Sequence, residues 1–149
     1  MEGTNKTIEY FRTLIGKEFS NGPSAFGNWL APIIVEINDG NITANYTVRK
    51  EMLNPAKMMH GGATAAIIDD VIGATLYCME LEFFYTTINL SVDYFSPAKL
   101  GDVLTAKTRI IKQGSKIIHA HCDVWNLETN VHVAKGHTNL IKTDIRFGL

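Results

Sequence analysis

Two adjacent carboxylates, Asp69 and Asp70, stand in the middle of an otherwise apolar run. The pattern of Ala65 to Ile68 before them and Val71-Ile72 after them predicts a helix, in which an unpaired carboxylate is costly to bury. Neighbouring residues on a helix point about 100° apart, so the two acids should occupy different environments. Two interpretations stay open: both acids are structural or line one wet edge of the helix, or one of them is catalytic.

The same helix opens with His60-Gly61-Gly62, and Asn54 precedes it by a few residues. A helix N-terminus presents unpaired N–H groups and the positive end of the helix dipole, and glycine lets a ligand approach the backbone closely. Such a place suits a carbonyl oxygen that gains negative charge during a reaction. The structural alternative is that the glycines only permit close helix–sheet packing and that His60 is a hydrogen-bonded core histidine.

Asp69 follows Gly61 by eight residues, which is roughly 12 Å along a helix axis. That distance is too long for Asp69 to act on a carbonyl held at the start of its own helix. A second copy of the helix, from a partner subunit, would bring a carboxylate to that carbonyl.

The elements that position these residues follow from hydrophobic periodicity and turn signals. Helices are predicted at Thr4 to Ile15, capped by Thr4 and with Ile8, Phe11 and Ile15 inward, at Ser24 to Leu30 and at His60 to Met79. Strands are predicted at Ile33 to Asn38, Ile42 to Val48, Thr86 to Phe95, Val103 to Lys112, Lys116 to Asn126 and Val131 to Thr143.

This order predicts an α+β fold in which a six-stranded antiparallel sheet wraps a long central helix. The helix is apolar on nearly every side and is expected to be buried. Short connections predict that the last four strands form an antiparallel meander. Residues 1–149 are expected to form a single domain, with residues 1–30 as an N-terminal helical extension.

Composition excludes several classes of protein. The chain has 149 residues, 46% hydrophobic and 19% charged, with a net charge of -1, so no strong field attracts nucleic acid or a membrane surface. No apolar run reaches the roughly 18 residues of a membrane span, and the first residues lack a signal-peptide core. A cytoplasmic protein is expected, with Cys78 and Cys122 as buried free thiols.

The segment Asn54-Pro-Ala-Lys-Met-Met-His60-Gly61-Gly62-Ala-Thr-Ala-Ala-Ile-Ile-Asp69 resembles the active-site segment of hotdog-fold acyl-CoA thioesterases. The resemblance is to the PaaI-type, phenylacetate-pathway group and its animal relatives, and it covers about residues 30 to 143. It extends through Thr87 to Ala98, Gly101-Asp102 and Lys112 to Lys116, and ends near Gly136-His137-Thr138.

The resemblance implies hydrolysis of an acyl-CoA thioester to a carboxylic acid and CoA, with no metal or organic cofactor. It implies that Asp69 is the nucleophile or the general base that activates water, and that the Gly61 N–H polarises the thioester carbonyl. His60 would support that oxyanion site, and Asn54 would orient the water or the thioester. Thr87, at a position that is often serine, would help to place the water. Asp70 has no implied chemical role.

The resemblance also implies a homodimer, or a homotetramer built as a dimer of dimers, with shared active sites. Asp69 and Thr87 of one subunit would face Asn54, His60 and Gly61 of the other. Contacts with CoA are implied for a set of residues at the helix start and at one strand turn: Gly62, Lys112, Gly114, Ser115 and Lys116. Lys99 and Lys142 are weaker candidates, since lysines at turns are usually only solvated.

Other functions and ligands are weighed against this one. A non-catalytic acyl-CoA-binding hotdog module would keep the groove but lose the acid, and the presence of Asp69 and Asn54 argues against it. A hotdog dehydratase or hydratase would use a catalytic histidine with an acid in other motifs. His119 and His121 alternate onto one strand face, but no cysteine or acid completes a metal-ligand set with clear spacing. The acyl group is left open by the sequence.

Overall fold

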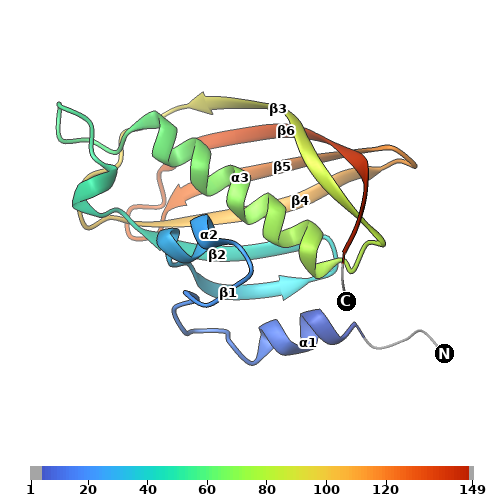
Figure 1. Ribbon diagram of the computed structural model, residues 1–149. Helices are drawn as coiled ribbons and strands as arrows, with labels where there is room; N and C mark the ends of the chain where they lie inside the picture. The colour runs from blue at the N-terminus through green and yellow to red at the C-terminus, as the bar shows by residue number, and fades with distance from the viewer. Residues whose placement is uncertain (1–4, 148–149) are drawn as a thin grey trace.

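The long helix α3 (Gly61–Cys78) lies across one face of a six-stranded antiparallel sheet in the computed structural model, which describes residues 5–147 (Figure 1). Two short helices, α1 (Lys6–Arg12) and α2 (Ala25–Leu30), and a 3-10 turn, η1 (Lys50–Met52), complete the helical part. The strands are β1 (Ile33–Asn38), β2 (Asn41–Thr47), β3 (Phe83–Tyr94), β4 (Val103–Gln113), β5 (Ile117–Asn126) and β6 (His132–Arg146). The predicted helices and strands are present, with shifted ends at several of them.

The strand order is β1-β2-β4-β5-β6-β3, which shows that the predicted meander of the last four strands is wrong in part. β4, β5 and β6 do form a meander, but β3 pairs with β6 at the edge of the sheet. The connection after β3 crosses the end of the sheet, from Phe95, whose N–H bonds the Val133 carbonyl, to Gly101, whose N–H bonds the Val48 carbonyl. β3 and β4 are not neighbours although the connection between them is short. The reason is that α3 crosses the sheet, so β3 begins at the edge opposite β1.

The core lies between α3 and the sheet. Its fully buried side chains include Ile67, Ile68 and Ile72 of α3, which belong to one core cluster with Leu104 and other strand residues. The helix approaches β6 closely at Gly136, where a β-carbon would lie 2.5 Å from Cγ2 of Ile68. This glycine therefore sets how deeply α3 sits on the sheet.

One side of α3 is uncovered, which corrects the prediction of a helix buried all round. Gly62, Asp69 and Gly73 are exposed and follow one stripe of the helix at spacings of seven and four residues. The prediction failed because glycine and alanine count as apolar in a periodicity pattern but have little area to bury. Asp69 is consequently an exposed acid in the single chain.

Helix α1 is shorter than predicted and lies beside β1, at the edge of the sheet opposite β3 (Figure 1). It ends before Ile15, a predicted inward residue that is 43% exposed. Asn5 caps the helix, because its Oδ1 accepts the N–H of Ile8. The predicted cap, Thr4, lies outside the described residues.

Strand β3 contains a β-bulge that turns two hydroxyl groups toward α3. Thr87 and Tyr94 are seven residues apart, so a regular strand would point them to opposite faces. The pairing with β6 shifts by one residue between Thr87 and Asn89, as in a bulge that leaves the extra residue unpaired. Both side chains then reach α3: Thr87 bonds Asp69 and Tyr94 bonds Gly61.

Two smaller predictions have outcomes in the fold. Cys78 and Cys122 are buried and free, as predicted. Within residues 5–147, none of the helices has the length and apolar character that a membrane crossing would require.

Candidate active site

Gly61 offers an unpaired backbone donor at the start of α3. It is the first residue of the helix, and His60 is the N-cap. The N–H of Gly62 donates to Nδ1 of His60 over 2.9 Å, whereas the N–H of Gly61 has no hydrogen-bond partner among residues 5–147. An unpaired N–H at the positive end of a helix can donate to an oxygen that carries negative charge.

His60 is an exposed cap residue, which corrects the alternative of a core histidine. Because its Nδ1 accepts the Gly62 N–H, the neutral imidazole carries its proton on Nε2. The Nε2–H is therefore a second donor at the helix start. Gly62 makes room for this cap, since a β-carbon there would lie 3.0 Å from Nδ1 of His60. The Gly62 amide itself is occupied, so a CoA contact of this residue would have to use other atoms.

Asn54 closes the loop before α3. Its Oδ1 accepts the N–H of Met58 over 3.1 Å, and its own N–H donates to the Met58 carbonyl over 2.7 Å. The Nδ2 group has no hydrogen-bond partner among the described residues. Asn54 thus has a structural task at its oxygen and a free donor at its nitrogen.

Asp69 is held by a hydroxyl group of the edge strand. Thr87 Oγ1 donates to Asp69 Oδ1 over 2.9 Å, and both residues are exposed. The other carboxylate oxygen, Oδ2, accepts no hydrogen bond within residues 5–147. The two residues that the resemblance assigns to one subunit's half of the site are therefore in direct contact.

Asp70 occupies a different environment, as expected for the neighbouring helix position. It is half-buried, and Tyr46 Oη lies 3.5 Å from its Oδ2. Burial raises the pKa of Asp70 to about 6, the Tyr46 hydrogen bond lowers it, and the Asp69 charge raises it. The carboxylate packs against α2, because a β-carbon at Gly27 would lie 2.7 Å from Asp70 Oδ1. The more buried acid of the pair is thus Asp70, while Asp69 is exposed.

The structure keeps the two halves of the predicted site apart within one chain. Asp69 and Gly61 lie on the same helix at the predicted separation, and no hydrogen bond joins Asp69 to Asn54, His60 or Gly61 in the described chain. The turn that holds Lys112, Gly114, Ser115 and Lys116 lies at the end of the sheet where β3 begins. The first turn of α3 lies at the other end, where β3 finishes (Figure 1).

The two weaker CoA candidates have local roles of their own. Lys142 Nζ lies 4.0 Å from the centre of the Phe83 ring, in a cation–π contact on β6 and β3. The backbone N–H of Lys99 donates to the Asp102 carboxylate in the connection after β3. Among residues 5–147, neither lysine side chain makes a hydrogen bond or a cation–π contact with the first turn of α3.

Tyr94 was missed by the sequence analysis. Its hydroxyl group donates to the Gly61 carbonyl over 2.8 Å, and its ring lies over the same residue. The only signal was its place in the resembling segment Thr87 to Ala98, because strict alternation from Thr87 would turn Tyr94 away from the helix.

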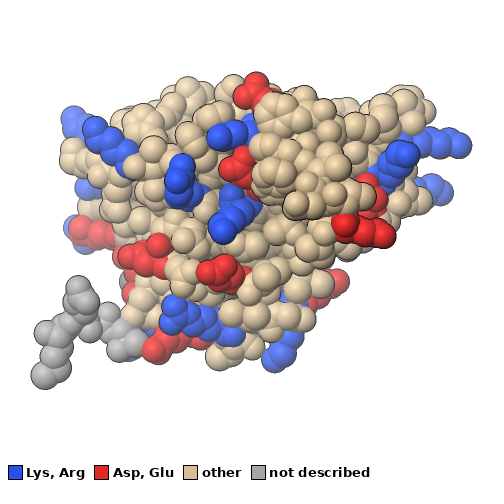
Figure 2. All heavy atoms as spheres, turned by 180° about the vertical axis from the view of Figure 1, so that it is seen from behind, with Lys and Arg blue, Asp and Glu red and all other residues tan. Residues whose placement is uncertain are grey.

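The face of the sheet away from α3 carries mixed charges and histidines of β5 and β6. Cross-strand pairing places Lys107, Asp123, Lys135 and Asp93 in one row from β4 to β3, and Figure 2 shows both signs interspersed from behind. His121 Nε2 lies 2.9 Å from His137 Nδ1. Among residues 5–147 no group of three or more His, Cys, Asp or Glu side chains could hold a metal ion.

A family model for the thioesterase superfamily matches residues 56–132, more than half of the chain. The chain belongs to the thioesterase superfamily. The matched thioesterase segment includes His60, Gly61, Asp69 and Thr87, so the Asp69–Thr87 contact and the start of α3 lie within it, whereas Asn54 precedes it.

Individual relatives and solved structures agree with the family match. Human acyl-coenzyme A thioesterase 13 is 29% identical over 106 residues, which are 70% of this chain and 76% of that protein. A Streptococcus pneumoniae hypothetical thioesterase, solved with coenzyme A, is 25% identical with a TM-score of 0.72 over 78% of this chain and 88% of that one. The Escherichia coli PaaI protein from the phenylacetic acid degradation operon has a TM-score of 0.76 at 20% identity, over 83% and 88% of the two chains. The predicted PaaI-type hotdog fold is confirmed.

Proposed function

We propose that this thioesterase-superfamily protein hydrolyses an acyl-CoA thioester to a free carboxylic acid and CoA. Its relatives named as acyl-coenzyme A thioesterases and its neighbour solved with coenzyme A support the substrate class. The observation that carries the proposal is that the chain offers two complementary groups. They are an unpaired Gly61 N–H at a helix start and an exposed Asp69 carboxylate held by Thr87.

In the proposed mechanism the Gly61 N–H donates to the thioester oxygen and His60 shapes this oxyanion site. Asp69 Oδ2 takes a proton from a water molecule as the water oxygen attacks the carbonyl carbon. The tetrahedral intermediate places its negative charge on the oxygen held at the helix start. It then collapses with breakage of the C–S bond, and the CoA thiolate takes the proton back from Asp69. The scheme requires no metal and no organic cofactor.

The reacting groups meet across two copies of the chain in this proposal. Asp69 of one copy acts on a thioester held by Gly61 of the other, because the roughly 12 Å between them on one helix is too long. Thr87 would accompany Asp69, and Asn54 would stand with Gly61. The turn from Lys112 to Lys116 also lies far from Gly61 of its own chain, so a partner's turn would have to supply these CoA contacts.

The sheet edge formed by β3 is the proposed surface of association. The other edge, β1, is already covered by the segment before it, since the Gly16 and Phe19 N–H groups bond the carbonyls of Ile34 and Pro32. β3 pairs only with β6 among residues 5–147, and its residues are mostly exposed. A long unpaired edge strand is a surface that natural proteins cover. Antiparallel pairing of two β3 strands would also run the two α3 helices in opposite directions.

A thiol-release assay over a panel of acyl-CoAs tests the function. Wild-type protein should release CoA from at least one of them, and Asp69→Asn should lose most of the turnover while it keeps the thermal unfolding midpoint. Binding of acyl-CoA by calorimetry without release of thiol from any of them would favour a non-catalytic binding module. Full turnover in Asp69→Asn would reject Asp69 as the base.

A matched pair of substitutions at Gly61 tests the oxyanion donor. Proline is tolerated at the first position of a helix and has no N–H, so Gly61→Pro removes the one group in question. Gly61→Ala adds a β-carbon but keeps the N–H. Loss of an oxyanion-hole donor lowers kcat by about 100-fold or more, and we expect this loss in Gly61→Pro with a much smaller one in Gly61→Ala. Equal losses in the two variants would mean that crowding, not the amide, matters.

A further inference from the structure

A hydrogen bond joins Tyr94 of β3 to Gly61 of α3, at the start of the helix. The Tyr94 hydroxyl donates to the Gly61 carbonyl oxygen over 2.8 Å. As a residue of the first helical turn, Gly61 also offers that oxygen to the helix's own hydrogen bonding. The phenol is therefore an additional contact that the helix does not need for its own backbone pairing.

The Tyr94 ring also occupies the space in front of Gly61. A β-carbon on Gly61 would lie 3.3 Å from both Cζ and Oη of Tyr94 and 3.4 Å from Cε1. The two 3.3 Å distances are tighter than an ordinary van der Waals contact, so a side chain at residue 61 would displace the ring by a few tenths of an ångström. The same closeness restricts how the Gly61 backbone can move toward the ring.

Glycine is the residue with the greatest freedom in its two backbone dihedral angles. The Gly61 N–H has no partner among residues 5–147 that would fix its direction. An oxyanion donor acts efficiently only when its direction is fixed before the reaction, and a displacement of about 1 Å can cost two orders of magnitude in rate. The peptide unit that carries this N–H is held on its carbonyl side, where the His60 oxygen accepts the N–H groups of Ala63 and Thr64 over 2.9 and 3.2 Å. A contact on the other side of the Gly61 α-carbon would restrain the amide further.

We propose that Tyr94 is a positioning residue, which fixes the Gly61 amide by bonding the Gly61 carbonyl and packing on its α-carbon. The inference rests on the proposed function, in which that amide holds the thioester oxygen. Tyr94 acts through Gly61 and is not assigned any contact with the substrate. The β-bulge after Thr87 has a functional reason in this view. It lets one strand bond both the base, Asp69, through Thr87 and the residue of the oxyanion donor, Gly61, through Tyr94.

The first test is Tyr94→Phe, which removes only the hydroxyl group. The Tyr94 side chain is 54% exposed, so this change should leave the thermal unfolding midpoint within a degree or two of the wild-type value. We expect kcat for the best acyl-CoA to fall about tenfold, with KM within a factor of about two. Tyr10→Phe is the matched control, because Tyr10 is 59% exposed and lies on α1, away from this site.

The second test separates positioning from general structural loss. In Tyr94→Phe, ¹⁵N relaxation of the Gly61 amide should give a lower order parameter than in the wild type, without substrate present. In a double-mutant cycle, the effects of Tyr94→Phe and Gly61→Ala on kcat should be non-additive, because both act on the same amide.

Three results would overturn the proposal: an unchanged kcat in Tyr94→Phe, an unchanged Gly61 order parameter, or additive effects in the cycle. A failure of the proposed function looks different, since the wild-type protein would then release no thiol from any acyl-CoA. The relaxation measurement still decides in that case whether Tyr94 fixes the Gly61 amide.

Discussion

Thr87 donates its hydroxyl hydrogen to one oxygen of Asp69 and leaves the other oxygen open to solvent. A carboxylate held in this way can direct its free oxygen at a water molecule, whereas an exposed acid without a partner would rotate among several positions. The methyl group that distinguishes threonine from serine does not prevent the 2.9 Å contact.

Replacement of the Thr87 hydroxyl should lower turnover. Thr87→Val keeps the branched shape and removes the donor, so we expect kcat to fall about tenfold while the unfolding midpoint stays close to that of the wild type. Thr87→Ser is the control, since it retains the donor and should keep most of the activity. A valine variant as active as the serine variant would show that the hydroxyl group has no part in the reaction.

Asp70 should make stability depend on pH. Burial raises its folded-state pKa from 3.8 to about 6, so the folded state binds this proton more tightly than the unfolded state does. The stability that comes with neutral Asp70 is fully present below about pH 4 and is lost as the pH rises to about 6. Asp70→Asn cannot ionise and avoids that loss.

Urea denaturation at fixed protein concentration measures this effect. The unfolding free energy of Asp70→Asn minus that of the wild type should increase by about 1–3 kcal/mol when the pH is raised from 4 to 8. Turnover should change little, because the side chain faces Tyr46 and α2 and not the exposed stripe of α3. The same stability difference at both pH values would show that Asp70 is not held in a raised-pKa environment.

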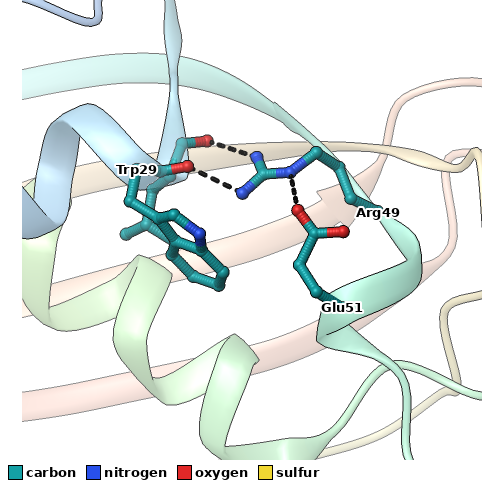
Figure 3. Close-up of polar contacts among 4 residues, drawn as sticks. Trp29, Arg49 and Glu51 are labelled. Carbon is teal, nitrogen blue, oxygen red and sulfur yellow. Dashed lines mark hydrogen bonds and ion pairs between the residues drawn. The ribbon is translucent and has the colours of Figure 1, made fainter.

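At the scale of elements, α2 is fastened to the strand region by one guanidinium group. Arg49 Nη2 and Nη1 donate to the carbonyls of Trp29 and Leu30 at the end of α2, and Nε bonds Glu51 at 2.7 Å (Figure 3). Its Cζ lies 4.9 Å from the centre of the Trp29 ring. Arg49 thus satisfies carbonyl groups that the helix end leaves unpaired, and so fixes the element that packs against Asp70.

Loss of this cap should destabilise the fold without a direct effect on chemistry. Arg49→Met keeps much of the aliphatic stem and removes the donors, and we expect a loss of about 1–3 kcal/mol in unfolding free energy. Arg49→Lys should recover only part of the loss, because an ammonium group cannot bond two carbonyls as a planar fork. Denaturation of the three proteins gives the order, and equal stability of the lysine and arginine proteins would contradict the fork arrangement.

At the scale of the whole molecule, shared sites predict that two inactive variants can rescue one another. Asp69→Asn damages one half of each site and Gly61→Pro damages the other. In a mixed dimer, one site combines the intact Asp69 of the proline variant with the intact Gly61 of the asparagine variant. Co-refolding equal amounts should therefore restore about a quarter of the wild-type activity if subunits pair at random.

The matched control mixes two variants with damage in the same half. Asp69→Asn and Thr87→Val leave no site with an intact Asp69–Thr87 pair, so their mixture should show no recovery beyond the sum of the two proteins. Size-exclusion chromatography of the mixtures gives the oligomeric state. Equal activity in the two mixtures, or an active monomer, would reject a site built from two chains.

The sequence by itself determined the classes of element and predicted the candidate site residues. Periodicity and turn signals gave the helices and six strands, because local backbone preferences and a two-sided pattern of burial are recorded along the chain. The His60-Gly61-Gly62 motif with Asp69 predicted the proposed chemistry and a site shared with a second copy, since the distance along a helix follows from residue count alone.

Only the tertiary structure decided the arrangement around those residues. It placed β3 at the edge of the sheet, exposed Asp69 while half-burying Asp70, and placed Tyr94 on Gly61 through a bulge. Each of these depends on where one element lies against another, and a bulge reverses the face of every later residue in a strand. Such contacts join residues far apart in the chain, so no pattern of neighbouring residues contains them.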